Sequence, residues 1–556
     1  MIKFLRSVFS IALMMLLLSS VATASTISKQ RALFVDAKAA LKANDLERFQ
    51  RLKSKLSNYP LVPYLDIWYA RKQLDQGDDF DIPKVLNQHA EIPEVIDLRL
   101  ARIKNLAERG QWPHVAIELE KLPYADRRLP EISMLSLWYT GKKDEALERF
   151  SERWTKGNDP SDLAMRCYQK WQAQGHPTRQ EIWLRLGTFA RQGKWQDVRK
   201  LEKSLSKADR KEVSRWHAMQ KNPLVVLNKW KAGKKQHLAA QMVVSDGLQR
   251  LSRNDALSAW KELHRLQKLF EKKKFQKFEQ RIALRAAGQH SLVAVTWLAG
   301  LPEEMQTEGT RAWQIRLQLL YGHWLEALEA MKRLPEVEQG HSRWSYWQAR
   351  SLEELGRKEE AQPLYQLTAS GRGYYSFMSA ERLGLPYQLG ASDLHASSSL
   401  LRELKRKPGI KRAREWWKLG EVGKATREWN LALKDASDEM WKAAAILASD
   451  WQWHNHVIRA AFKAGEPNAL ERRFPIAFGQ AVANTSQESG LSQSLIWSII
   501  RQESAFNAKA VSRVGARGLM QLRPSTAREV ARRHKVSNGT PDLFDPAVNI
   551  RLGALY

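Results

Sequence analysis

The sequence has a single cysteine, Cys167, among its 556 residues. An intramolecular disulfide is therefore excluded, which is compatible with an oxidising compartment but does not indicate one. The 13 histidines are scattered along the chain, and the cysteine has no neighbouring ligand to complete a metal site. We therefore expect no metal and no cofactor. The length allows several domains.

Long apolar runs are missing after the N-terminus. The first residues include the basic Lys3 and Arg6. An apolar stretch over 8–18 follows, and then the small residues Ala22-Thr23-Ala24. This pattern predicts a cleaved signal peptide over residues 1–24. An uncleaved anchor is the alternative, but the stretch is short for a membrane-spanning helix. No cysteine lies near the cleavage site, so we expect export without a lipid anchor and without stable membrane insertion.

Strand-type alternation and hairpin signals such as Asn-Gly are almost absent between Thr26 and Pro386. Amphipathic helical segments follow one another there, and many of the turns between them place a glycine at the end of one helix. Clear examples of such turns are at Gly110, Gly141, Gly193, Gly322 and Gly356. The predicted fold class is all-α, with a tetratricopeptide-like helical solenoid over residues 25–386. A plain helical bundle is the alternative, but one core rarely grows to this length.

Two breaks divide the remainder of the chain. The helical pattern stops around Gly384-Leu385-Pro386, and shorter helices follow a serine-rich stretch. A second break lies near Gly465-Glu466-Pro467. We therefore expect a small helical domain over residues 387–466 and a C-terminal domain over residues 467–556.

Acidic residues are too few to balance the basic ones, and the formal net charge is +30. Such a charge favours polyanionic partners. In the cytoplasm this would suggest nucleic acid, but behind a signal peptide we expect the carboxylates of the cell wall and no nucleic acid. Each dense basic run, taken alone, is also explained as a solvated helix face. These runs are Lys272-Lys273-Lys274, 229–235 and 402–414.

The most informative stretch runs from Leu491 to Pro524. Ser492 is a good N-cap, and apolar residues at helical spacing follow it, which predicts an amphipathic helix. Continuing that face leads to Glu503 at the C-terminal end of the helix. We expect burial and the negative end of the helix dipole to favour the protonated carboxyl, as a general acid requires. A loop with Gly515 and Gly518 follows, and glycine permits close approach of a ligand.

Three ordered motifs in this region carry a resemblance to a known family. They are Glu503-Ser504, then Gly518-Leu519-Met520-Gln521-Leu522-x-Pro524, and then Asn549-Ile550-x-x-Gly553-x-x-Tyr556. Together they resemble the soluble lytic murein transglycosylases, which are relatives of goose-type lysozyme. The motifs cover the end of the chain from Phe474 on, whereas the helical N-terminal region and the signal peptide match the family's architecture more loosely.

The resemblance implies an architecture and a setting. The solenoid would be U-shaped or ring-shaped, residues 387–466 would form a linker domain, and residues 467–556 would form a lysozyme-like catalytic domain. In the family this domain continues beyond the third motif, so we expect it to be incomplete at its C-terminal end. The expected location is the periplasm and the expected partners are peptidoglycan glycan strands. Cell-wall synthesis or division proteins are further candidate partners, and the expected oligomeric state is a monomer.

The resemblance also implies a reaction. The MurNAc–GlcNAc β-1,4 bond would be cleaved with formation of a 1,6-anhydromuramic acid end, and Glu503 would act as the single general acid and base. Ser504 would orient the acid or the substrate, and Gln521 would hydrogen-bond an acetamido group. Four further residues of the motifs would contribute to glycan binding. They are Gly518, Met520, Asn549 and Tyr556.

Two other functions stay open at this point. A lysozyme-like hydrolase of the same bond would need a second carboxylate or a positioned water opposite Glu503. The candidates for that carboxylate have simpler interpretations as loop or helix-cap residues, and they are Glu488, Glu529, Asp542 and Asp545. The second alternative is a non-catalytic helical scaffold that binds the cell wall or partner proteins.

Overall fold

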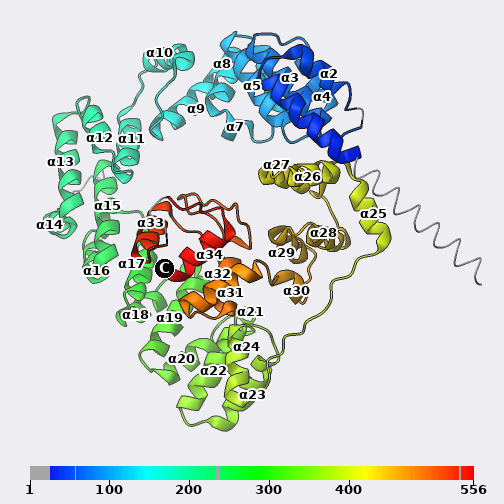
Figure 1. Ribbon diagram of the computed structural model, residues 1–556. Helices are drawn as coiled ribbons and strands as arrows, with labels where there is room; N and C mark the ends of the chain where they lie inside the picture. Colours follow the sequence, from blue (N-terminus) through cyan, green and yellow to red (C-terminus); the bar gives the residue numbers. More distant parts are fainter. Residues whose placement is uncertain (1–25, 57, 232–237, 537–539) are drawn as a thin grey trace, which may run out of the picture. The chain divides into compact units, whose positions relative to one another are not determined.

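The computed structural model describes residues 26–56, 58–231, 238–536 and 540–556, and its regular secondary structure is helical throughout these ranges (Figure 1). The predicted all-α class is confirmed. The predicted signal peptide over 1–24 lies outside the described residues. No helix in the described part of the chain has the length and apolar composition that a membrane crossing requires.

The chain divides into two compact units. The first unit combines residues up to Pro123 with residues from Ala391 on, and the second is Tyr124–Gly390. After an initial helix over 26–42, the first unit contains α2 (Leu46–Lys53), α3 (Val62–Asp75), α4 (Ile82–Gln88), α5 (Val95–Glu108), α6 (Trp112–Glu120), α25 (Ser398–Arg406), α26 (Pro408–Lys418), α27 (Val422–Ala432), α28 (Asp438–Asp450), α29 (His454–Lys463), α30 (Leu470–Arg473), α31 (Gly479–Ser489), α32 (Gln493–Ser504), α33 (Pro524–Arg533) and α34 (Pro546–Leu555).

The second unit is a succession of helices of 3 to 17 residues, several of them paired. It contains α7 (Ala125–Arg128), α8 (Pro130–Tyr139), α9 (Lys143–Thr155), η1 (Asp162–Ala164), α10 (Met165–Ala173), α11 (Arg179–Arg191), α12 (Trp195–Glu202), α13 (Lys207–Lys221), α14 (Pro223–Asn228), α15 (Leu238–Asn254), α16 (Ala256–Arg265), η2 (Gln267–Leu269), α17 (Lys272–Gly288), α18 (Val293–Ala299), η3 (Glu303–Met305), α19 (Glu308–Leu320), α20 (Trp324–Lys332), α21 (Glu336–Gln339), α22 (Ser342–Glu354), α23 (Lys358–Ala369) and α24 (Tyr374–Leu383).

The turn glycines that the sequence singles out all have the predicted role. Each has a positive φ, between 71° and 96°, and each is followed two residues later by the first residue of a helix. Gly110, for example, has φ 71° between α5 and α6. A side chain with a Cβ atom would be strained in this left-handed conformation, so glycine ends one helix and lets the chain reverse into the next.

The core of the first unit joins the two ends of the chain. One hydrophobic cluster contains side chains from residues 34–98 and from 394–469. The Phe34 ring packs edge-on against Trp416, with 5.7 Å between ring centroids. Arg31 donates two hydrogen bonds to the buried Glu415, of 2.8 and 2.9 Å, across 384 residues of sequence. The start of the predicted solenoid therefore shares its core with the predicted linker domain.

A buried histidine lies in this core without a polar partner. His456 on α29 is 3% exposed, and neither ring nitrogen has a hydrogen-bond partner among the described residues. Its ring stacks on Trp453 with 3.5 Å between centroids. Desolvation by burial, helped by the charge of Arg459, lowers the pKa of His456 to about 3. The imidazole is therefore held in its neutral form.

We expect this histidine to make the first unit acid-sensitive. The unfolded chain binds a proton at His456 below about pH 6.5 and the folded chain does not, so stability falls as the pH drops through this range. Between pH 7 and pH 5 the loss should be about 2 kcal/mol. Urea denaturation at both pH values should show that His456→Phe removes this part of the loss.

The exposed His395 supplies the control, because its ring stays hydrated in both states. The variant His395→Gln should keep the pH dependence of the wild type. Equal pH dependence in His456→Phe and in the wild type would contradict the assignment.

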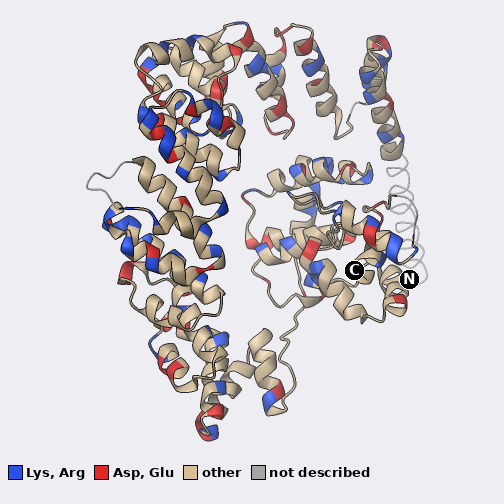
Figure 2. Ribbon diagram, turned by 90° about the vertical axis from the view of Figure 1, so that its left-hand side faces the viewer, with Lys and Arg blue, Asp and Glu red and all other residues tan. Residues whose placement is uncertain are grey.

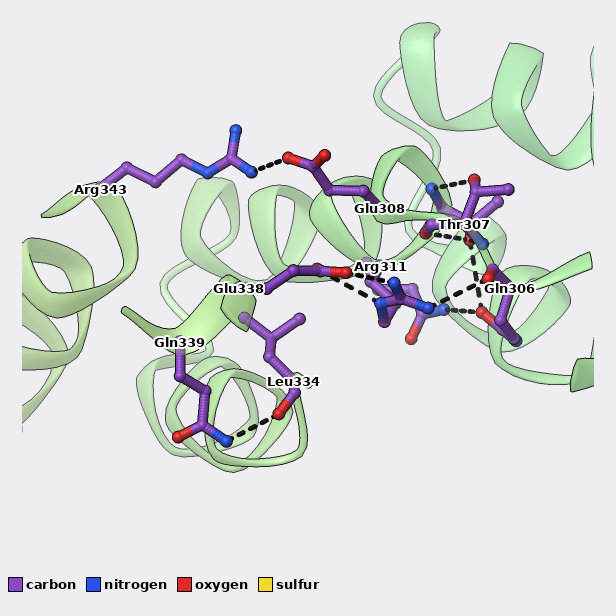
Figure 3. Close-up of polar contacts among 10 residues, drawn as sticks. Gln306, Thr307, Glu308, Arg311, Leu334, Glu338, Gln339 and Arg343 are labelled. Atoms are coloured by element: carbon purple, nitrogen blue, oxygen red, sulfur yellow. Dashed lines mark hydrogen bonds and ion pairs between the residues drawn. The ribbon is translucent and has the colours of Figure 1, made fainter. Parts of the chain in front are cut away.

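Basic residues are spread over many helices and are interleaved with acidic ones (Figure 2). In the second unit, polar side chains also join neighbouring helices to one another. Arg311 on α19 pairs with Glu338 on α21 and donates a 3.0 Å hydrogen bond to the Gln306 carbonyl (Figure 3). Gln339 donates a 2.7 Å hydrogen bond to the Leu334 carbonyl. Arg311 is structural, because its charge is neutralised by the buried carboxylate of Glu338.

Candidate active site

The helix that carries Glu503 is α32, and both of its ends form as the sequence predicts. The Ser492 hydroxyl accepts a 3.3 Å hydrogen bond from the Leu495 amide and caps the start. The helix ends at Ser504 because Ala505 and Phe506 adopt positive φ values of 48° and 65°. Phe506 is 5% exposed and packs into the core of the C-terminal region. The reversal fixes the end of the helix and with it the position of Glu503.

Glu503 is exposed, so the predicted burial of this carboxylate is wrong. The reason lies in the helix face that it continues. Glu503 follows Leu495 and Ile499 at intervals of four residues, and Leu495 is 46% exposed. The buried face is formed by Ile496 and Ile500, which are fully buried. A face that begins with the exposed Leu495 and continues with the partly buried Ile499 therefore leads along α32 to a solvent-accessible carboxylate.

Ser504 continues the buried face. Its hydroxyl donates a 3.0 Å hydrogen bond to the Ile500 carbonyl within the same helix. Its carbonyl accepts a 3.1 Å bond from the Asn507 amide in the following turn. These contacts place Ser504 in the framework of the helix end.

The loop after α32 folds on itself through short antiparallel contacts. The Arg517 amide donates to the Leu522 carbonyl at 2.9 Å, and the Leu522 amide returns a 3.1 Å bond. Between them Gln521 has φ 50°, and its side-chain amide donates to the carbonyls of Gly518 and Ala510 at 2.9 and 3.3 Å. The side-chain nitrogen of Gln521 therefore holds the loop, while its side-chain oxygen is a hydrogen-bond acceptor that has no donor among the described residues.

Asn549 on α34 connects this loop to the rest of the domain. It is 0% exposed, its side-chain oxygen accepts a 2.7 Å bond from the Met520 amide, and its side-chain nitrogen donates to the carbonyls of Arg517 and Leu543 at 3.0 Å each. Gly518 has φ 76°, and a Cβ atom there would lie 2.1 Å from the Leu543 carbonyl oxygen. The second and third sequence motifs therefore meet at one packed junction.

The other motif residues divide between core and surface. Met520 is 6% exposed and packs against Gly553, where an added Cβ would lie 2.5 Å from the Met520 sulfur. Tyr556 is 79% exposed. Packing thus explains Met520, whereas the side chain of Tyr556 is accessible to a ligand.

The candidates for a second carboxylate all have other partners. Arg551 donates two 2.7 Å hydrogen bonds to Glu488, and Arg533 donates a 2.8 Å bond to Glu529. Asp542 accepts a 2.8 Å bond from the Phe544 amide, and Asp545 caps α34 by accepting a 2.9 Å bond from the Val548 amide. Their interpretation as ion-paired, loop and helix-cap residues is supported.

Two cavities lie next to α32 or its end, and sequence reasoning did not predict them. One, of about 370 Å³, has exposed apolar side chains on its wall, Phe474 and Ile476, beside Trp497 and Gln502 of α32. The other, of about 580 Å³, contains Trp417 and Trp451 together with Phe506 and Lys509. Aromatic residues near a predicted acid-bearing helix are the sequence signal that could have indicated these surfaces.

Comparisons with known proteins agree on one group of proteins. A family model described as the transglycosylase SLT domain matches residues 480–556, and one described as the soluble lytic murein transglycosylase L domain matches residues 403–470. The chain is 25% identical over 551 residues to the soluble lytic murein transglycosylase of Escherichia coli K12, covering 98% of this chain and 84% of that protein.

Two solved structures extend the comparison. An inactive Glu-to-Gln mutant of the lytic transglycosylase Slt from Pseudomonas aeruginosa superposes with a TM-score of 0.79 at 30% identity, covering 94% of this chain and 85% of that one. The 70 kDa soluble lytic transglycosylase from Escherichia coli gives a TM-score of 0.76 at 24% identity, covering 95% and 86%. The second match supports the fold.

Proposed function

Because the chain belongs to the soluble lytic murein transglycosylase family, and is thus a peptidoglycan lytic transglycosylase, we propose its reaction and its catalytic residue. It cleaves the MurNAc–GlcNAc β-1,4 bond and leaves a 1,6-anhydromuramic acid end, with Glu503 as the single general acid and base. The observation that carries this proposal is the accessible carboxylate of Glu503 at the fixed end of α32. The other candidate carboxylates are held by ion pairs or by hydrogen bonds to the backbone. The inactive Glu-to-Gln relative is consistent with it.

The reaction needs only one carboxyl group. Protonated Glu503 donates its proton to the glycosidic oxygen, and the C1–O bond breaks while the 2-acetamido oxygen of the same sugar assists at the anomeric carbon. The resulting carboxylate of Glu503 then takes the proton of the C6 hydroxyl, and O6 bonds to C1 to close the anhydro ring. The proton count balances, Glu503 returns to its acid form, and no water is consumed.

The surrounding residues take two kinds of role in this proposal. Gln521 and the exposed Tyr556 contact the glycan, the former through its side-chain oxygen. Ser504, Gly518, Met520 and Asn549 act indirectly, because their contacts hold the end of α32 and the loop in place. Phe474 and Ile476 add an exposed apolar wall against which a sugar ring can pack.

The setting of the enzyme is part of the proposal. We propose that the protein is exported with cleavage of residues 1–24. It then acts in the periplasm, as a monomer, on peptidoglycan glycan strands. Residues 387–466 would act as the linker domain and residues 467–556 as the catalytic domain. The family model matches at 403–470 and 480–556 support this division.

The product identifies the reaction. Purified protein is incubated with peptidoglycan sacculi, and the released muropeptides are analysed by mass spectrometry. Anhydro ends are 18 Da lighter than hydrolysed ends because no water is added, and we expect only the lighter species. Sacculi treated with a lysozyme provide the hydrolytic reference. Products with reducing ends would contradict this proposal and indicate a hydrolase. Hydrolysis would require a water molecule positioned opposite Glu503.

A further inference from the structure

The second unit contains a cavity that the proposed reaction does not use. It has a volume of about 290 Å³ and lies between one face of α15 and one face of α17, which appear together with α16 in Figure 1. Arg191, the last residue of α11, and Trp216 of α13 complete its wall. We call it the α15–α17 pocket.

Cationic side chains surround this pocket without carboxylate partners. Lys274, Lys277 and Arg281 project from one face of α17 at intervals of three and four residues, and Arg191 is the fourth cation. None of the four has a carboxylate within ion-pair distance in the described ranges. Like charges at this spacing repel one another. The paired Arg311 of Figure 3 shows how a structural cation of the same unit is neutralised.

The pocket's own carboxylate does not offset these charges, because it is engaged elsewhere. Asp246 accepts hydrogen bonds from Arg250 at 2.9 Å, from Gln220 at 3.0 Å and from the Trp216 indole at 2.9 Å. Its charge is therefore neutralised by Arg250 on the same helix. The four cations therefore leave a net positive charge around the cavity.

The floor of the pocket is apolar and carries one unpartnered polar atom. Trp216 is 1% exposed and Phe278 is 6% exposed. The hydroxyl oxygen of Ser245 is buried and has no hydrogen-bond partner among the described residues. Desolvation by burial lowers the pKa of Lys274 despite the nearby Glu271. A bound anion would compensate this desolvation, and a ligand acceptor would satisfy the serine.

We propose that the α15–α17 pocket is a binding site for a short acidic peptide with at least two carboxylates. The fork-shaped guanidinium groups of Arg191 and Arg281 suit carboxylates, and the two lysines add point charges. The apolar floor favours an organic ligand with aliphatic carbons over a small inorganic anion. The volume corresponds to about ten water molecules, which is enough for a dipeptide segment. The site depends on no catalytic step, so it can stand or fail independently of the reaction proposed for Glu503.

The experiment measures binding by isothermal titration calorimetry with the full chain. The probe is the end-blocked tetrapeptide Ala-Glu-Glu-Ala, its neutral counterpart is Ala-Gln-Gln-Ala, and sodium phosphate is the inorganic competitor. The test variant is the double substitution Lys274→Gln and Lys277→Gln. The matched control is Lys272→Gln and Lys273→Gln, which removes the same charge from the same helix at exposed positions outside the pocket. Glutamine preserves helix propensity, so both variants should fold.

We expect the acidic peptide to bind and the neutral peptide not to bind. The test variant should weaken binding by roughly tenfold or more, and the control by less than about twofold. Equal weakening by both variants would reduce the effect to overall charge and overturn the site. Equal binding of the two peptides, or no binding of either, would also overturn it. Displacement of the peptide by an equal concentration of phosphate would show a general anion site and overturn the peptide assignment.

Discussion

The variant Glu503→Gln is expected to lower the rate of muropeptide release from sacculi by roughly a thousandfold or more. Glutamine has almost the same shape but can neither donate the proton to the glycosidic oxygen nor accept the proton of the C6 hydroxyl. Both steps of the proposed reaction are lost together. The denaturation temperature should stay within about 1 °C of the wild type, because an exposed side chain that has no partner among the described residues contributes little to stability. Release is measured by chromatography of the soluble products.

The same chemical change at two other carboxylates is the control. Glu488→Gln and Glu529→Gln each remove a charge from an exposed ion pair near the site in sequence, with Arg551 and Arg533. Such pairs contribute about 0–1 kcal/mol, so both variants should fold and keep activity within about twofold. Full activity of Glu503→Gln would remove this residue from the mechanism. A large loss in Glu529→Gln or Glu488→Gln would point to a second catalytic carboxylate and to hydrolysis.

Helix α32 shows how far sequence periodicity can predict a site. The N-cap at Ser492, the helical spacing and the end beside Glu503 follow from local residue types, and the structure contains all three. The spacing could not tell which half of the apolar stripe is buried. Ile496 and Ile500 face the core, whereas Leu495 faces solvent and its side of the helix leads to Glu503. Burial depends on what packs against a helix, and the sequence of that helix does not contain this information.

Long-range pairings were equally inaccessible from the sequence. The contact between Arg31 and Glu415 joins residues with no local relation, and so does the packing of Phe34 on Trp416. In contrast, the turn at Gly110 was predictable because its backbone conformation is a local property. Local rules therefore gave the all-α class and the helix ends, and tertiary packing decided how the first helices and the predicted linker domain share a core.

Asn549→Ala is expected to destabilise the catalytic region by about 3 kcal/mol. Two backbone groups would lose their partner inside the core, namely the Met520 amide and the Leu543 carbonyl, and the Arg517 carbonyl would keep only its bond from the Leu522 amide. The lost side chain would also leave a cavity, because Asn549 is completely buried. The loop that carries Gln521 would detach from α34, and activity should fall together with stability. A fall of about 10 °C or more is expected in the thermal transition of this region, followed by differential scanning calorimetry.

The role of Asn549 as an internal support can be separated from a role in glycan binding. Arg551→Gln on the same helix removes an exposed ion pair and should lower stability by less than about 1 kcal/mol. If Asn549 supports the loop, its alanine variant loses stability in the absence of any glycan. Part of the lost activity should then return at low temperature, where the loop is folded again. If Asn549 instead contacted the glycan, the variant would keep its thermal transition and raise KM alone. The first outcome follows from the hydrogen bonds of the structure, because a side chain that uses both of its polar atoms on the backbone has little capacity left for a ligand.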